Sequence, residues 1–272
     1  MIYATKHILI EILVRLPCCQ STICATLNST KMKNLFLVII ICLGIDGLNA
    51  QTSTMWDYPI KPGTSQWASI TDHKDMIKVS QIPENILKSI STKELIQLCL
   101  DYPLRADFYA YNSLQEGVKK VSTYFNGLQE LFNRPDNAQY LLEYLKSFEQ
   151  EIQPNIAYAP INSGECTINQ MLVEVFLSQE MVLSNASPTI KKEIISTALK
   201  NMLQKERLVD IYGNMGVGTS AYLLCLGLNS ETDLISQSPI LNQFSHDAYL
   251  KGSSIIEELV LKYSLYLKNN SL

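Results

Sequence analysis

Hydrophobic residues recur at intervals of three and four along most of the chain after residue 83, with polar residues between them. In the segment 113–133 the apolar positions are Leu114, Val118, Val121, Phe125, Leu128 and Phe132. This spacing predicts one amphipathic helix with an inward face, and it predicts that Phe125 is buried. Asn133-Arg134-Pro135 is expected to end the helix.

The same periodicity predicts further helices at residues 72–79, 83–90, 91–101, 136–148, 167–182, 187–202 and 254–266, with a short one before His246. Three helices begin with a predicted capping box: Ser91 with Glu94, Ser113 with Glu116, and Ser254 with Glu257. The best candidate for a strand, residues 208–212, is short. We therefore expect an all-α domain, an array of about seven or eight packed helices.

The N-terminal part of the chain has a different pattern. Lys31 and Lys33 precede the apolar run Phe36–Ile45, and Ala50 is the small residue at the expected cut. A basic region, an apolar core and a small residue at the cut are typical of a secretory signal peptide, here residues 32–50. The core is shorter than the roughly 20 residues that span a bilayer, so no stable membrane span is expected after cleavage.

These features divide the chain into four parts. Residues 1–31 are interpreted as an annotation extension upstream of Met32, the alternative being an unusually long basic region. Residues 32–50 are the signal peptide. Residues 51–82, with two prolines and both tryptophans, are expected to form an irregular N-terminal arm, and residues 83–272 the helical domain.

Composition and charge narrow the function classes. With 47% hydrophobic and 18% charged residues, the chain is typical of a globular protein. After Ala50 it keeps 18 basic and 24 acidic side chains, a formal net charge of −6. An acidic chain without a basic stripe argues against nucleic acid and anionic membranes as partners.

Three cysteines follow the signal peptide: Cys99, Cys166 and Cys225. At most one disulfide can form among them, and Cys99 with Cys166 is the candidate pair. Cys225 lies in an apolar run and is expected to be buried.

One combination of residues suggests catalysis. Cys166 is expected at a loop-to-helix junction, where a helix N-terminus lowers a thiol pKa. With His246 as base and Asp247 beside it, Cys166 would be the nucleophile of a cysteine-dependent hydrolase. No family signature surrounds Cys166, and a disulfide or an inert thiol requires less coincidence. The leading expectation is therefore that no residue is catalytic.

Two further patterns are weaker. The run Gly213–Ser220 has the glycines of a phosphate loop, but Gly218 stands where the lysine is needed. We interpret it as a loop before a buried segment, residues 221–228. Asp72, His73 and Asp75 lack a further histidine or cysteine at ligand spacing, so a solvated turn is expected. Neither a cofactor nor a metal is expected.

Four tyrosines fall in expected loops: Tyr102, Tyr109, Tyr111 and Tyr158. Tyrosine in a loop suits contact with protein or sugar, because it offers apolar area and a hydroxyl. The alternative is that these rings seal the edges of helix packing. A protein or a glycan is therefore the expected partner.

A set of residues between Trp67 and Tyr144 carries a resemblance: Gln81, Ile82, Pro83, Ser91, Thr92, Leu95, Cys99, Leu100, Tyr102, Pro103, Asn112, Gln115, Gly117, Phe125, Asn126, Leu131, Arg134 and Asp136. In this third of the chain the sequence resembles a group of uncharacterised exported helical proteins of Gram-negative gut anaerobes. The resemblance implies bacterial origin, export and a helical domain, and it transfers no functional residue.

The sequence thus predicts an exported, non-catalytic interaction or structural protein in the periplasm or outside the cell. The alternative is the hydrolase that uses Cys166 and His246.

Overall fold

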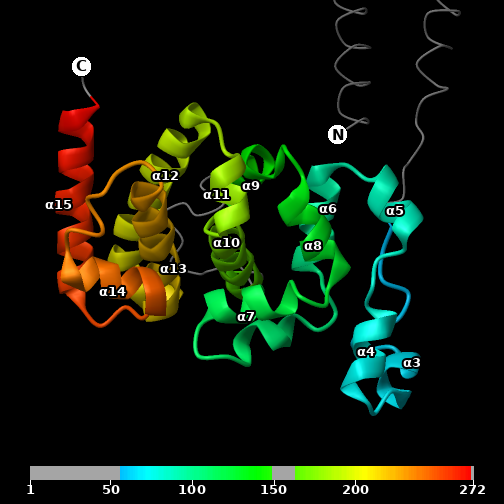
Figure 1. The fold of residues 1–272 in the computed structure, drawn as a ribbon. Helices are drawn as coiled ribbons and strands as arrows, with labels where there is room; N and C mark the ends of the chain where they lie inside the picture. The colour runs from blue at the N-terminus through cyan, green and yellow to red at the C-terminus, as the bar shows by residue number, and fades with distance from the viewer. Residues whose placement is uncertain (1–55, 149–162, 271–272) are drawn as a thin grey trace, which may run out of the picture. The chain divides into compact units, whose positions relative to one another are not determined.

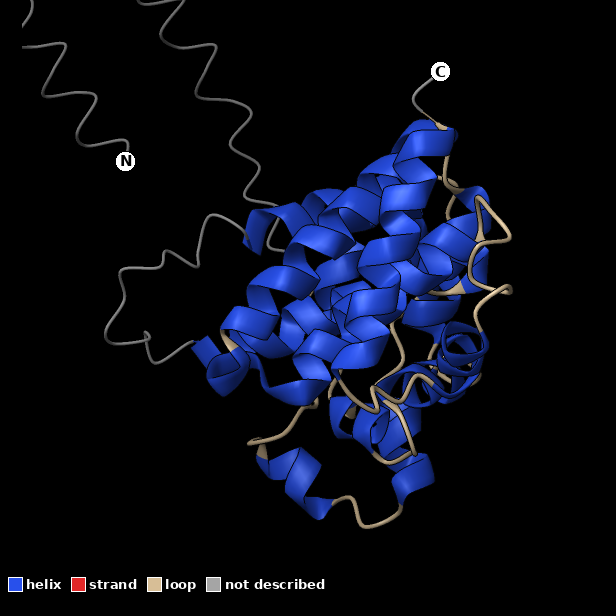
Figure 2. Cartoon of the chain, turned by 90° about the vertical axis from the view of Figure 1, so that its left-hand side faces the viewer, coloured by secondary structure: helices blue, strands red, loops and turns tan. Residues whose placement is uncertain are grey.

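A computed structural model describes residues 56–148 and 163–270 (Figure 1), and throughout these ranges the chain is helical, without strands (Figure 2). The all-α prediction is therefore confirmed. The described ranges contain thirteen α-helices and one 3-10 helix. That is more than the expected seven or eight. The helices Ser65–Ser69 and Glu180–Asn185 have only five and six residues and are not predicted by the periodicity, and the segment 113–133 forms two helices.

The first half of the described chain contains α3 (Ser65–Ser69), α4 (His73–Val79), α5 (Glu84–Ser89), α6 (Thr92–Leu100), the 3-10 helix η1 (Arg105–Tyr109), α7 (Leu114–Val121), α8 (Asn126–Asn133) and α9 (Asn137–Ser147). The second half contains α10 (Ser163–Leu177), α11 (Glu180–Asn185), α12 (Pro188–Arg207), α13 (Val209–Asn229), α14 (Pro239–Asp247) and α15 (Ser253–Asn269).

Several predicted helix starts are confirmed. Ser91 and Glu94 form the complete capping box of α6, with the Ser91 hydroxyl accepting from the Glu94 amide and the Glu94 carboxylate accepting from the Ser91 amide. Ser187 caps α12, and Pro188 takes the first helical position.

The other two predicted capping boxes are not complete. Ser113 does accept from the Glu116 amide, but the Glu116 carboxylate accepts from the side chain of Asn112. The last helix, α15, begins at Ser253 with Gly252 at the N-cap position. Ser254, the predicted cap, is therefore already inside the helix.

The prediction of one helix over residues 113–133 is wrong. The chain leaves the helix after Val121, and α8 starts only at Asn126, with Phe125 in an extended conformation between them. The hydroxyls of Ser122 and Thr123 donate back to main-chain carbonyls three residues earlier, which competes with helix continuation. Phe125 is nevertheless fully buried, as predicted, and stacks on Tyr102 with 4.0 Å between ring centroids.

The strand candidate at residues 208–212 is also corrected, because this segment is the first turn of α13. Gly213 alone departs from helical geometry, with φ 63° and ψ 175°. The rest of the glycine-rich run continues the helix, so the expected loop is a single kink. Positive φ favours glycine at that position.

The core is formed where the longer helices pack on one another. The helix pair α12 and α13 makes the most extensive contact, and α10 packs against α13, α9 and α7 (Figure 1). The close approach of η1 to α7 requires a glycine at position 117, since a Cβ on Gly117 would lie 1.9 Å from the carbonyl oxygen of Phe108. The core holds η1 tightly against α7.

Some predictions fall outside the described residues: the extension 1–31, the signal peptide 32–50, and Tyr158. In the part that the structure describes, no helix combines the length and the apolar character needed to cross a membrane.

Candidate functional site

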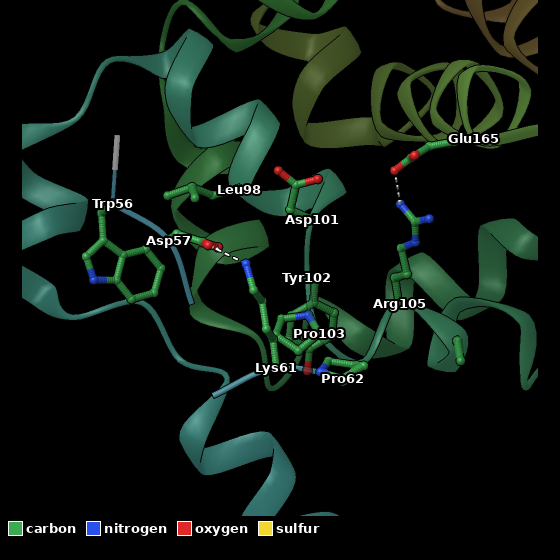
Figure 3. Close-up of a pocket in the computed structure, with 11 residues that line it drawn as sticks. Trp56, Asp57, Lys61, Pro62, Leu98, Asp101, Tyr102, Pro103, Arg105 and Glu165 are labelled. Atoms are coloured by element: carbon green, nitrogen blue, oxygen red, sulfur yellow. Dashed lines mark hydrogen bonds and ion pairs between the residues drawn. The ribbon is translucent and has the colours of Figure 1, made fainter. Parts of the chain in front are cut away.

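A groove of ≈ 720 Å³ lies where the N-terminal arm meets the end of α6, η1 and the start of α10 (Figure 3). Its lining comes from three stretches of the chain: Trp56, Asp57, Lys61, Pro62, Leu98, Asp101, Tyr102, Pro103, Arg105, Ala106 and Glu165. The volume falls within the range of about 300–1,000 Å³ that is typical of small-molecule sites.

The arm forms one wall and is anchored by Tyr58. The Tyr58 ring is buried, and its hydroxyl donates a 3.0 Å hydrogen bond to the carbonyl of Leu98. Trp56 packs on this ring in a T-shaped arrangement, with centroids 4.9 Å apart. The indole that lines the groove is therefore held by a fixed partner.

Asp57 and Lys61 form an ion pair on the same wall. The hydrogen bond from Lys61 lowers the pKa of Asp57, and the Tyr58 amide adds to this effect through a 2.7 Å bond to the carboxylate. Both side chains are exposed, so the pair is available to a ligand.

The opposite side of the groove carries Asp101, Arg105 and Glu165. Asp101 accepts a 2.9 Å hydrogen bond from the side chain of Gln97. The Arg105 guanidinium donates to the carbonyl of Leu100 at 3.2 Å, and it lies 3.8 Å from the Glu165 carboxylate. Figure 3 shows Arg105 directed toward Glu165. Each charged group of the groove thus has a polar partner in the protein.

Asn126 attaches the arm to the helical domain. Its side-chain oxygen accepts from the Ile82 amide at 3.0 Å, its side-chain nitrogen donates to the Ile82 carbonyl at 2.7 Å, and its own amide donates to Gln81. These residues are among those that carry the resemblance described above, and here they join the arm to the start of α8.

The arm is attached a second time through His73, a residue of the group considered above for metal binding. His73 Nε2 lies 3.0 Å from Asp107 Oδ2, which also accepts a 2.9 Å hydrogen bond from the Tyr124 hydroxyl. Asp72 caps α4, and Asp75 pairs with Lys78. Among the described residues, no group of three or more His, Cys, Asp or Glu side chains could hold a metal ion.

A second polar cluster is buried between α10, α12 and α13. The Glu174 carboxylate accepts from Lys205 at 2.7 Å, Thr219 at 2.6 Å, Ser220 at 2.7 Å and Asn201 at 3.3 Å. Side-chain exposure is 0% for Glu174 and 1% for Lys205. Burial lowers the pKa of Lys205, and the adjacent carboxylate opposes that shift. All four donors converge on one carboxylate away from solvent, which is the arrangement of a structural network.

This cluster accounts for the end of the glycine-rich run. Thr219 and Ser220 donate to Glu174 from inside α13, so their hydroxyls face the protein interior. The run is a helix segment whose polar residues serve internal packing.

The residues of the possible hydrolase lie on different helices. Cys166 is half-buried on α10, whose main neighbours are α13, α9 and α7. His246 and Asp247 are exposed at the end of α14, which packs against α13 and α15. His246 Nδ1 lies 2.7 Å from the Asn242 carbonyl, and Asp247 accepts from the Tyr249 amide. These bonds are local to α14 and its end.

The candidate disulfide is not formed. Cys99 is a thiol buried in the core, where burial raises its pKa well above the ordinary value. Cys225 is a buried thiol as predicted, with its pKa raised by burial to about 12. Neither is a reactive nucleophile in the folded chain.

The loop tyrosines divide into two kinds. Tyr102 is buried under the groove and stacks on Phe125, which agrees with a packing role. Tyr109 and Tyr111 are exposed on and just after η1.

Sequence reasoning missed both polar sites. A signal for the buried network was present, since Glu174 interrupts the apolar run from Met171 to Leu177. A charge inside such a run indicates a buried partner. The groove has no comparable signal, because its walls come from residues 56–62, 98–106 and 165. Comparison of the chain with protein-family models, with curated proteins and with solved structures finds no match.

Proposed function

We propose that the mature chain is an exported, non-catalytic binding protein and that the groove lined by Trp56 is its ligand site. The observation that carries this proposal is the groove itself. It combines ligand-sized volume, a fixed aromatic side chain and several polar groups that converge from three parts of the chain. Tyr109 and Tyr111 add exposed aromatic area on η1 and after it.

The state of the potentially reactive side chains elsewhere in the molecule supports a binding role. The Glu174 carboxylate is saturated and enclosed, so a substrate would have to displace core packing to reach it. His246 is engaged within its own helix. The groove itself contains no cysteine, serine or histidine.

Export is part of the proposal and rests on the sequence of residues 32–50. N-terminal sequencing of protein recovered outside the cytoplasm should begin at or near Gln51. An exported protein that keeps Met1 or Met32 would contradict this part of the proposal.

The binding role is tested by calorimetric titration of the mature chain with a panel of peptides, oligosaccharides and small polar metabolites. We expect at least one saturable ligand whose binding is lost in Trp56→Ala. Trp67→Phe is the matched control, because Trp67 lies on α3 and does not line the groove. Binding unaffected by Trp56→Ala, or no saturable binding, would contradict the proposal.

The hydrolase alternative is tested on the same protein with peptide and ester substrates. Turnover by the wild type that both Cys166→Ser and His246→Ala abolish, in folded proteins, would replace the binding proposal with an enzyme.

A further inference from the structure

Resting on the proposed function, we propose that the groove binds a neutral oligosaccharide of a few sugar units, with one sugar ring stacked on Trp56 and the hydroxyls of another unit bonded to Asp101 and Arg105 on the opposite side.

The charges of the groove disfavour charged ligands. Three carboxylates and two cations line it: Asp57, Asp101, Glu165, Lys61 and Arg105. An anion would meet the excess of carboxylates. A cation would compete with Lys61 for Asp57 and with Arg105 for Glu165, both of which are already paired. The third carboxylate, Asp101, already accepts a hydrogen bond from Gln97.

The same groups suit hydroxyls. A sugar hydroxyl both donates and accepts, so it can donate to a carboxylate and accept from the adjacent cation without breaking the existing pair. Arg105 and Glu165 form such a pair, 3.8 Å apart, and Asp101 lies on the same side of the groove. A purely apolar ligand would remove water from five charged groups and gain no hydrogen bonds.

Trp56 supplies the apolar surface. An indole is a large flat side chain that buries much area at low conformational cost. The Trp56 ring contacts Tyr58 in a T-shaped arrangement, not a parallel stack, with 4.9 Å between the ring centroids. A pyranose ring, with C–H groups on its faces and hydroxyls at its edge, matches an aromatic plane beside polar groups.

An oligosaccharide accounts for the groove better than a peptide does. Extended peptides commonly add to a sheet edge, and the described residues contain no strand. Helical peptides need an apolar groove, whereas this one is lined by charged side chains on both sides.

The test uses an array of neutral, acidic and basic oligosaccharides, followed by calorimetry with the neutral ones that bind. In Trp67→Phe the single remaining tryptophan is Trp56, so its fluorescence reports the groove directly. We expect a neutral oligosaccharide to change that fluorescence saturably, with an affinity nearly independent of added salt. We expect Trp56→Ala to weaken binding by about tenfold or more, and Asp101→Ala to weaken it by a smaller factor.

The outcomes separate this inference from the proposed function. If only acidic or basic glycans bind, or only a peptide from the earlier panel binds at Trp56, the ligand class is wrong and the binding role stands. If neutral glycans bind equally well to Trp56→Ala, both are wrong. Circular dichroism and thermal melts of each variant establish that it is folded.

Discussion

Two ion pairs in this molecule join a lysine ammonium to a carboxylate, and they have opposite surroundings. Glu174 and Lys205 are enclosed by α10, α12 and α13, with two hydroxyls and an amide on the same carboxylate. Asp57 and Lys61 lie on the arm, with side chains 61% and 47% exposed. Burial determines what each pair can do. The enclosed pair has no capacity left for a ligand, whereas the exposed pair gains little from pairing and remains accessible.

The largest expected effect is on the enclosed pair. Lys205→Met should lower the free energy of unfolding by about 3–5 kcal/mol, because the Glu174 charge stays buried without its cation. Urea denaturation of the mature chain measures this. A loss of unfolding free energy below about 1 kcal/mol would mean that water reaches Glu174. It would contradict the contrast drawn between the enclosed and the exposed pair.

A double variant separates charge from shape. Glu174→Gln combined with Lys205→Met removes both charges and keeps an oxygen that can accept from Thr219 and Ser220. We expect it to be more stable than Lys205→Met alone by at least about 2 kcal/mol. A double variant as unstable as the single one would show that the loss comes from packing.

A smaller effect is expected where the arm is attached. Asn126→Ala removes two hydrogen bonds to Ile82, and it should cost about 1–3 kcal/mol. It should also weaken ligand binding, because the groove wall belongs to the arm. Asn133→Ala is the matched control: Asn133 is exposed and its side chain donates to the Gln129 carbonyl of its own helix, so its cost should stay below about 1 kcal/mol. Equal costs for the two variants would show that the arm is not held through Asn126.

The smallest effect on stability is expected at the exposed pair. Lys61→Met should change the free energy of unfolding by less than about 1 kcal/mol, since exposed ion pairs contribute little. The same denaturation experiment, with Lys78→Met at the exposed Asp75 pair as reference, checks this. If Lys61→Met lowered the free energy of unfolding nearly as much as Lys205→Met, the exposed and the enclosed pair would not differ as proposed.

The parts of the fold that follow from the sequence are those set by local signals. The Ser91 capping box, the Ser187-Pro188 start and the buried positions of 136–148 depend on residues within one or two turns of each other. The break before α8 depends only partly on such signals. The Ser122 and Thr123 hydroxyls favour it locally, but it also coincides with the docking of Gln81 and Ile82 on Asn126, 45 and 44 residues away. The groove is non-local for the same reason. Its residues belong to the arm, to the end of α6 and to α10, and no spacing in the sequence relates them.

The enclosed Glu174 also bears on how the chain avoids wrong alignments. The apolar side chains of α12 and α13 attract one another without a preferred direction, so a slip by one turn, about 5.4 Å, would preserve much of their contact. The same slip would move Lys205 away from Glu174 and leave both charges buried without a partner in an apolar interior. Only one alignment of three helices satisfies the carboxylate. The network therefore selects a single register in a domain whose many amphipathic helices would otherwise be nearly interchangeable.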